Sequence, residues 1–304
     1  MSVKNASLAT LREDLKVGFG LAAKNIISFV LAMVGVLIVA GLLLAVIVIC
    51  MIAVILIAAG GTPGIIQLFI TLSIQWNASA GVIVIGTALL VVLPVLLPFF
   101  VAGGAIFGMG REVIESNGTT VEGVFVWYKS KFVPLALGGI IAFLIEIGPP
   151  ALLSLVLAST SAGVVVDGPL VVLSVFSAVW WLLTSGMLSM LFPAIIDGHS
   201  VIEALRVSIR LATKYVDRVL STWLALVIMA ALLASPLLLL SLPFGPFFHP
   251  LGAGSYAVLF GIVFVFLLVP AASITLNRVY LILSGEDHAR REDDTPGIDI
   301  VGGV

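Results

Sequence analysis

The pattern that decides the fold is clearest in the stretch SVIEALRVSIRLATKYV (Ser200–Val216), which leads into a long apolar run. It opens with a capping box, in which the Ser200 hydroxyl and the Glu203 carboxyl bond backbone amides of the first helical turn. One apolar face follows the three- and four-residue spacing of a helix: Ile202, Leu205, Ile209, Ala212 and Val216. A charged face carries Glu203 and three interfacial basic residues, Arg206, Arg210 and Lys214. The stretch therefore predicts an amphipathic helix lying in the lipid headgroup layer.

The same opening occurs three times along the chain. The predicted helix caps are Thr10 with Glu13, Thr119 with Glu122, and Ser200 with Glu203. Each begins a predicted surface helix, over residues 10–24, 119–131 and 200–216, and each surface helix precedes an apolar run. The repetition indicates three units, each built from a surface helix and a transmembrane hairpin.

The composition places the chain in a bilayer. Hydrophobic residues make up 61% of the sequence and charged residues 10%, whereas a typical soluble domain is about 25% charged. Apolar runs longer than about 18 residues recur, which is the length needed to cross a membrane as a helix. The predicted fold is an all-α, polytopic membrane helical bundle in one domain, residues 1–284, followed by a flexible acidic cytoplasmic tail over residues 285–304. The six predicted spans cover about residues 25–59, 80–109, 132–158, 170–196, 219–242 and 256–283.

The distribution of basic residues predicts the orientation. All 14 Lys and Arg fall at the N-terminus, in the connections after spans 2 and 4, and around the end of span 6. The connections after spans 1, 3 and 5 contain none. Because Lys and Arg are enriched in cytoplasmic connections, both termini and the three surface helices are expected in the cytoplasm, in a multi-pass protein of the plasma membrane. Arg278, near the inner end of span 6, is expected to reach the lipid phosphates.

Glu146 is the one acidic residue deep inside a predicted span. An isolated charge there is costly, so its carboxyl group is expected to be mainly protonated at pH 7 and to face the bundle interior. One interpretation is a hydrogen bond to span 4, where the candidate partners are Trp180, Trp181, Thr184 and Ser185. The other is a proton or cation site beside a helix interrupted at Pro149-Pro150.

The residues that commonly carry chemistry lack the necessary spacing. His199, His249 and His288 are scattered, and Cys50 is the single cysteine. Neither pattern matches a metal site, and no nucleophile-elbow, phosphate-loop or metalloprotease motif occurs. The expectation is a protein that is not an enzyme and has no catalytic residue, cofactor or metal. The net charge of −2 argues against nucleic-acid binding.

One segment resembles a known family. The stretch FPAIID (Phe192–Asp197), followed by VIEALRVS (Val201–Ser208), is similar to a recurring segment of uncharacterised prokaryotic, largely archaeal, six-span membrane proteins. That family resembles the membrane domain of membrane-anchored glycerophosphodiester phosphodiesterases. The resemblance implies a similar six-span layout. Residues 1–304 contain no soluble phosphodiesterase barrel, so the resemblance does not imply that activity.

Two functions follow from these observations. The leading hypothesis is a non-enzymatic membrane protein that organises partner proteins or lipids; its expected partners are the bilayer, other membrane proteins or further copies of itself. The alternative is a transport permease subunit of the six-span ABC-like type, in which the helix over residues 200–216 docks an ATPase. A polar cavity reaching the membrane midplane favours transport, and a solid apolar interior favours organisation.

Overall fold

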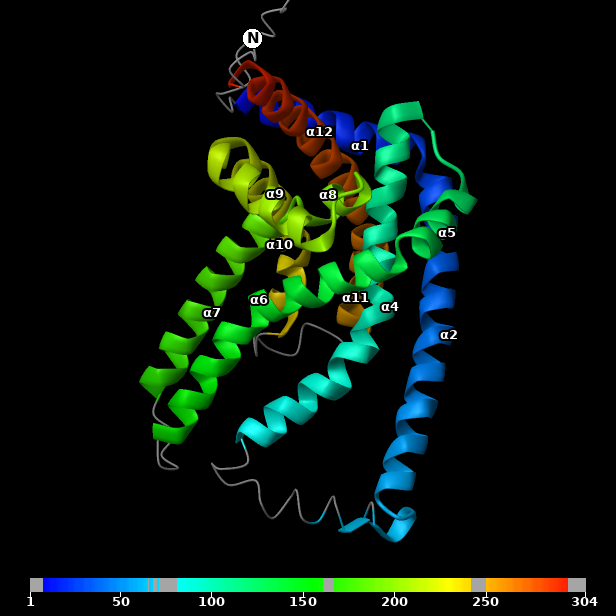
Figure 1. The fold of residues 1–304 in the computed structure, drawn as a ribbon, viewed down its shortest axis with the longest axis vertical. Helices are drawn as coiled ribbons and strands as arrows, with labels where there is room; N and C mark the ends of the chain where they lie inside the picture. The colour runs from blue at the N-terminus through cyan, green and yellow to red at the C-terminus, as the bar shows by residue number, and fades with distance from the viewer. Residues whose placement is uncertain are drawn as a thin grey trace, which may run out of the picture.

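The computed structural model describes residues 8–64, 66–67, 70, 81–116, 118–160, 167–241 and 250–294. Within these residues the regular structure is helical, as predicted (Figure 1). The helices are α1 (Leu8–Lys24), α2 (Ile26–Ala58), α4 (Gly81–Ser116), α5 (Val121–Ser130), α6 (Phe132–Thr160), α7 (Asp167–Leu188), α8 (Leu191–Ile196), α9 (Val201–Lys214), α10 (Val216–Ser241), α11 (Pro250–Val263), the π-helix η2 (Phe264–Leu268) and α12 (Val269–Asp294).

Six stretches of these helices are long and apolar enough to cross a membrane, so the chain is an integral membrane protein. They are Ile26–Ala58, Val92–Ser116, Phe132–Leu157, Val171–Ile196, Val216–Leu237 and Ser255–Gly285. The fold class predicted from the sequence is confirmed.

Two details of the predicted spans need correction. The helix α6 continues through Pro149 and Pro150, so the interruption expected beside Glu146 is absent. The first part of the predicted tail, residues 285–294, is helical, because α12 continues to Asp294. Residues 285–294 contain Arg, Glu and Ala, which favour helices, and the helix breakers Pro296 and Gly297 come only later. The rest of the predicted tail, residues 295–304, lies outside the described residues.

Each surface helix is joined to the following span by one non-helical residue: Asn25, Lys131 or Tyr215. Their φ angles are −105°, −113° and −123°. At each joint, the residue's N–H donates to the carbonyl four residues before it, and its carbonyl accepts from the N–H four residues after it. The chain can therefore change direction without leaving these backbone groups unpaired.

The burial pattern repeats around the three joints. The residue four positions after each joint is fully buried: Phe29, Leu135 and Val219. The residue three positions before each joint is also buried: Ala22, Tyr128 and Ala212. Three equivalent units therefore pack in the same helical register, which gives the predicted repeat a structural basis.

The core lies where the second halves of the three units meet. Helices α4, α8 and α12 contact one another there, and Met109, Ile195 and Ile274 from these helices are fully buried. Close approach is possible because a Cβ at Gly108 would lie 2.3 Å from the Trp127 ring, and one at Gly104 would lie 2.4 Å from the Leu135 side chain. The glycines spaced four apart in α4 thus let α5 and α6 pack closely against it.

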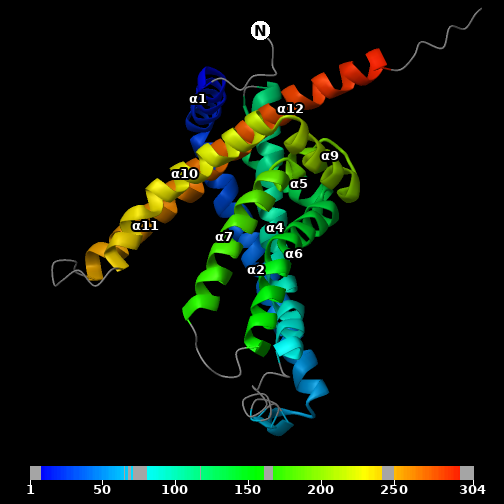
Figure 2. The same cartoon turned by 90° about the vertical axis from the view of Figure 1, so that its left-hand side faces the viewer.

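The far ends of the spans pack much less. Within the most apolar 18 residues of the α6 span, no residue is buried. In the equivalent stretch of the α4 span, 44% of the residues are buried. Among the residues whose burial the structure describes, those buried in α2, α6 and α10 lie within residues 29–40, 135–139 and 218–226, close to the joints. Beyond them the helices diverge, with α2, α7 and α11 pointing in different directions (Figures 1 and 2).

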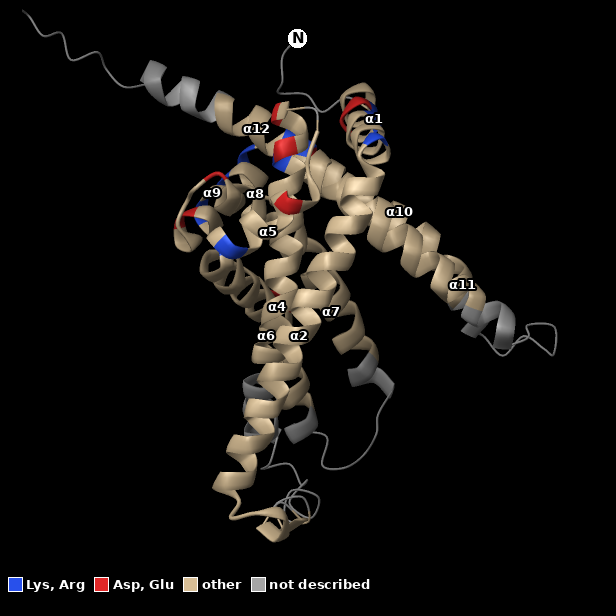
Figure 3. Cartoon of the chain, turned by 90° about the vertical axis from the view of Figure 1, so that its right-hand side faces the viewer, with Lys and Arg blue, Asp and Glu red and all other residues tan. Residues whose placement is uncertain are grey.

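Charged residues gather at the packed end. Positions occupied by Lys, Arg, Asp and Glu are coloured mainly in the part of the ribbon that contains α1, α5, α8 and α9, and the long spans are nearly free of them (Figure 3). Segments far apart in the sequence therefore bring their charges to one end of the bundle. We call this region, which holds the three surface helices and the inner ends of α4, α8 and α12, the surface-helix end.

Candidate functional site

A glycine turn places a carboxylate at the centre of the surface-helix end. Helix α8 ends at Ile196 with Asp197 as its C-cap residue, and Gly198 follows with φ +107°, a conformation that glycine adopts without steric cost. Gly198 N–H donates to the Ile195 carbonyl and His199 N–H to the Ala194 carbonyl, each at 3.2 Å. These two bonds form a Schellman motif, which satisfies the last carbonyls of α8.

Asp197 links the inner ends of three helices. Its Oδ1 accepts a hydrogen bond from Arg111 Nη1 of α4 at 2.7 Å, and its Oδ2 accepts one from the Tyr280 hydroxyl of α12 at 2.9 Å. Arg111 also forms an ion pair with Glu115 one turn along α4. Tyr280 is fully buried, so this is an anchored contact that ties α4, α8 and α12 together.

A second carboxylate, Asp14, is buried between two arginines. Only 1% of Asp14 is exposed. Its Oδ2 accepts from Arg218 Nη2 of α10 at 2.9 Å and its Oδ1 from Arg278 Nε of α12 at 3.1 Å. Arg278 Nη2 lies 3.1 Å from Oε1 of the exposed Glu13. The network joins α1, α10 and α12, and it contains two acidic and two basic side chains, so its formal charges balance.

This network corrects the prediction for Arg278. The side chain turns into the protein to pair with Asp14 and Glu13, rather than extending to lipid phosphates. The two networks share α12, where Arg278 and Tyr280 are two positions apart.

A third carboxylate, Glu112, organises the start of the second unit. Its Oε1 accepts from Trp127 Nε1 at 2.7 Å and its Oε2 from the Thr119 hydroxyl at 2.8 Å. A Cβ at Gly123 would lie 2.6 Å from Oε2, so glycine is needed where α5 passes the carboxylate. Tyr128 of α5 lies near this contact in the chain. Burial raises the pKa of its hydroxyl group, and its ring packs edge-on against the Phe132 ring.

The predicted helix caps need correction at all three positions. Thr10 lies inside α1, which already includes Leu8. Thr119 bonds to Glu112, and Thr120 occupies the N-cap position of α5 instead. Ser200 does occupy the N-cap position of α9, but its hydroxyl makes no capping hydrogen bond.

The acidic members of the three boxes have other roles. Glu13 pairs with Arg278, and Glu203 Oε1 lies 3.3 Å from Nδ1 of His199. Glu122 sits in the first turn of α5, where a negative charge favours the helix dipole. Thr10 precedes its joint by the same number of residues as Ser200, whereas Thr119 lies three residues closer to its joint. The second box is therefore out of register with the other two.

The amphipathic helix α9 has three sides rather than two. Its buried residues are Ala204, Val207, Ser208, Leu211 and Ala212, which share only Ala212 with the predicted apolar face. At about 100° of rotation per residue, Ile202 and Ile209 lie on a separate side, and Ile202 is 61% exposed; Val216, predicted to extend this face, lies beyond the joint at Tyr215 as the first residue of α10. One apolar side thus packs on the protein, and the other, with Ile202 exposed and Ile209 partly buried, is covered only in part by the described residues.

The basic residues of α9 occupy the third side. Arg206 and Lys214 are exposed and Arg210 is partly buried. The Lys214 ammonium group lies 5.5 Å from the centre of the Tyr215 ring, which is close enough for a cation–π contact. Helix α9 thus carries a charged side, a side that packs on the protein and a second apolar side.

Glu146 is not bonded to the predicted partners in span 4. Trp180 Nε1 donates to the carbonyl of the neighbouring Ile145 at 2.9 Å, and the Thr184 hydroxyl donates to the Trp180 carbonyl at 2.7 Å. Ser185 donates to the Trp181 carbonyl, and the Trp181 ring packs edge-on against Trp223. Glu146 is half-buried, and among the described residues no hydrogen bond or ion pair to its carboxyl group is found.

These arrangements hold helices together more readily than they perform chemistry. The carboxylates of Asp14, Glu112 and Asp197 are each engaged by two donors on other parts of the fold. Across the described part of the chain, no group of three His, Cys, Asp or Glu side chains is placed to hold a metal ion.

Sequence reasoning missed Asp14, Arg111, Asp197, Arg218 and Tyr280. The pairs they form are separated by 83 to 264 residues in the chain, so no local spacing reveals them. One signal was available: Arg111, Asp197 and Arg218 all border long apolar runs, where a charged side chain needs a partner.

No protein-family model, curated protein or solved structure matches the chain. The similarity to the membrane domain of glycerophosphodiester phosphodiesterases therefore stays a prediction.

Proposed function

We propose that the protein is a non-enzymatic integral membrane protein that organises partner proteins or lipids. The observation that carries this proposal is the uneven packing of the spans. The helices are bound together at the surface-helix end, while the spans beyond it present long apolar surfaces, with Leu42 and Ile49 of α2 each 65% exposed. Such surfaces are covered in a membrane by lipid or by other proteins.

The interior of the surface-helix end also favours organisation over transport. Where α4, α8 and α12 meet, the space is filled by fully buried Met109, Ile195 and Ile274. On the side of the charged layer, ion pairs between Asp14, Arg218 and Arg278 link the helices. A permease needs helices that move apart around a polar path, and a packed apolar centre with paired charges opposes that movement.

The permease alternative gains no support from α9. A coupling helix for an ATPase is expected to stand out from its neighbours, whereas α1, α5 and α9 precede their spans through the same kind of joint. The resemblance to membrane domains of glycerophosphodiester phosphodiesterases remains part of the proposal, because those domains place another protein module at a membrane.

We further propose that the surface-helix end, with the three surface helices and both termini, lies in the cytoplasm of a cell whose plasma membrane holds the chain. The support is the gathering of Lys and Arg at one end of the bundle together with their enrichment on the cytoplasmic side of membranes. Single cysteines introduced at Thr119 and Ser200, in a Cys50→Ser background, are expected to react with impermeant reagents only from inside. Labelling of either position from outside would reverse the orientation.

The function is tested by extracting the full chain in polymer-bounded native membrane discs and identifying the proteins and lipids around it. Two variants introduce two tryptophans each on different exposed surfaces: Leu42→Trp with Ile49→Trp on α2, and Val171→Trp with Val175→Trp on α7. A specific partner or lipid class is expected around the wild type and is lost in one variant but kept in the other.

Two results would contradict the proposal. One is that the discs of the wild type and of both variants contain the same proteins and lipids, in the same proportions, as the bulk membrane. The other is solute flux through vesicles containing the purified chain and an ATPase that binds α9, which is the outcome the permease alternative requires.

A further inference from the structure

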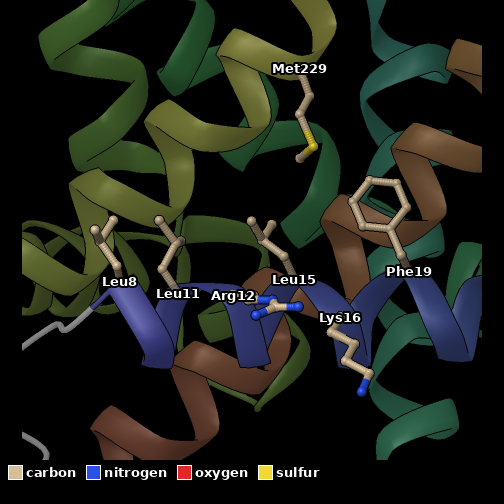
Figure 4. Close-up of a pocket in the computed structure, with 7 residues that line it drawn as sticks. All are labelled: Leu8, Leu11, Arg12, Leu15, Lys16, Phe19 and Met229. Carbon is tan, nitrogen blue, oxygen red and sulfur yellow. The ribbon is translucent and has the colours of Figure 1, made fainter.

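An apolar groove of about 420 Å³ lies between α1 and α10 at the surface-helix end. Its apolar lining comes from Leu8, Leu11, Leu15 and Phe19 of α1 and from Met229 of α10. Figure 4 shows the four side chains of α1 pointing to the side from which Met229 approaches. Leu8 is 86% exposed, so the groove is open at the start of α1.

The groove exists because α1 attaches to the bundle through a different side. Its buried residues are Asp14, Gly18 and Ala22. A Cβ at Gly18 would lie 1.9 Å from the Thr275 hydroxyl and 3.1 Å from the Ala271 carbonyl, so this side is pressed against α12. Leu8, Leu11 and Leu15 lie on the adjacent side of α1, and only part of this apolar side reaches α10.

Two cations border the apolar lining. Arg12 and Lys16 are four residues apart, so they share one side of α1, and both are exposed lining residues of the groove. The nearest acidic side chains on α1 are already engaged, Glu13 by Arg278 and Asp14 by Arg218 and Arg278. Among the described residues neither Arg12 nor Lys16 has an ion-pair partner.

We propose that this groove binds one anionic phospholipid, with its phosphate at Arg12 and Lys16 and its acyl chains between α1 and α10. Apolar lining and adjacent cations are complementary to the two parts of such a lipid, and the site lies at the end of the bundle where the charged residues gather. A soluble anion would satisfy the cations but leave Leu11, Leu15 and Phe19 exposed to water. The inference rests on the proposed membrane function and names a lipid class and a site for it.

The test is a titration of the purified full chain in neutral detergent with phosphatidylglycerol or phosphatidylcholine, read by native mass spectrometry of the one-lipid complex. Phosphatidylglycerol is expected to bind the wild type more tightly than phosphatidylcholine. Replacing both cations, Arg12→Gln with Lys16→Gln, is expected to weaken phosphatidylglycerol binding roughly 30-fold. That estimate uses about 1 kcal/mol for each basic residue near an anionic lipid surface and about 1.4 kcal/mol for each factor of ten.

A control variant removes the same charge elsewhere. Lys129→Gln with Arg206→Gln changes exposed residues on α5 and α9 and is expected to change the dissociation constant by less than about twofold, because both residues lie outside the groove lining. A third variant, Met229→Trp, narrows the groove on the α10 side and is expected to weaken binding of both lipids while leaving the cations in place.

Three results would overturn the proposal: equal binding of the two lipids by the wild type, equal loss in the cation variant and its control, or unchanged binding in Met229→Trp. None of these three results would contradict the proposed function, because that function is tested by the proteins and lipids recovered in native discs. The converse result is that native discs have the composition of the bulk membrane while the purified chain still binds phosphatidylglycerol selectively. That combination would contradict the proposed function and would leave the assignment of the lipid to the groove unchanged.

Discussion

The two ends of the spans differ in how tightly their helices pack. Near the joints, glycines, buried polar groups and ion pairs fix helices against one another, as at Gly108 against Trp127 and at Asp14 between Arg218 and Arg278. Farther along α2, α6 and α7 the side chains are apolar and largely uncovered. In a membrane, apolar surface alone provides little drive for helices to associate, because lipid tails are equally apolar. Specific contacts therefore decide where this chain packs, and they are concentrated at one end.

Two acidic residues make the same contrast. Asp14 is buried and held by two arginines, whereas Glu146 is half-buried in α6 and has no hydrogen-bond partner among the described residues. A charge with fixed partners is a structural contact. An acid without partners in a span can stay protonated and contribute little to stability.

The largest expected effect comes from removing the buried charge at Asp14. Asp14→Asn leaves Arg218 buried without its anion, and removing one partner of a buried ion pair costs about 3–5 kcal/mol. The measurement is unfolding of the full chain in mixed detergent micelles. Glu13→Gln, which removes the neighbouring but exposed partner of Arg278, is the control and is expected to cost less than about 1 kcal/mol. Equal losses in the two variants would mean that the Asp14 network does not hold the helices.

A smaller effect is expected from adding one methyl group at the close contact between α4 and α5. Gly108→Ala places its Cβ 2.3 Å from the Trp127 ring, so the rings and helices must shift, at a cost of about 1–3 kcal/mol. Gly103 lies on the same helix with open space around its Cβ position. Gly103→Ala is therefore expected to be neutral or stabilising by up to about 1 kcal/mol. Unfolding of both variants separates packing from helix propensity, and a neutral Gly108→Ala would refute the close contact.

Two serines of the α9 region are expected to differ by a smaller margin. The buried Ser208 hydroxyl donates to the Met187 carbonyl at 2.7 Å, so Ser208→Ala is expected to cost about 0.5–1.5 kcal/mol. Ser200 makes no capping bond, so Ser200→Ala is expected to fall within about 0.5 kcal/mol of the wild type. Helix content and unfolding of the two variants test this, and a larger loss at Ser200 would restore the predicted capping box.

The smallest effect is expected at Glu146. Both Glu146→Gln and Glu146→Leu are expected to leave stability within about 0.5 kcal/mol of the wild type, because this carboxyl group has no hydrogen bond to the described residues that the substitutions would remove. Proton flux into vesicles is measured alongside stability. A marked destabilisation in the Leu variant would indicate a structural partner, and flux that the Gln variant abolishes would favour the transport alternative.

The sequence predicted the parts of the fold that depend on local chemistry. Long apolar runs and the segregation of Lys and Arg indicated the spans, and the helical periodicity indicated the surface helices. The periodicity of α9 could not say which apolar side packs on the protein, because Ile202 and Leu211 are equally apolar and only the tertiary contacts bury Leu211. The capping box at Thr119 failed because Glu112, seven residues earlier, competes for the hydroxyl.

The candidate contacts were harder to predict, because their partners are distant in the chain. Asp14 and Arg278 are 264 residues apart. Each is an ordinary interfacial residue when its own segment is considered alone. They are brought together by the packing of α1 on α12, where Gly18 lies against Thr275 and Ala271.

The central claim is that the chain is packed at the surface-helix end and open along the far ends of its spans. Spin-label distance measurements on two pairs test it most directly, in a background in which the exposed Cys50 is replaced by Ser. One pair, Lys129 with Arg206, lies on α5 and α9; the other, Ile57 with Val172, lies toward the far ends of α2 and α7. We expect a narrow distance distribution for the first pair in detergent and in native discs, and for the second pair a broad one in detergent that narrows in native discs. A second pair as narrow in detergent as the first, and unchanged in native discs, would contradict the claim.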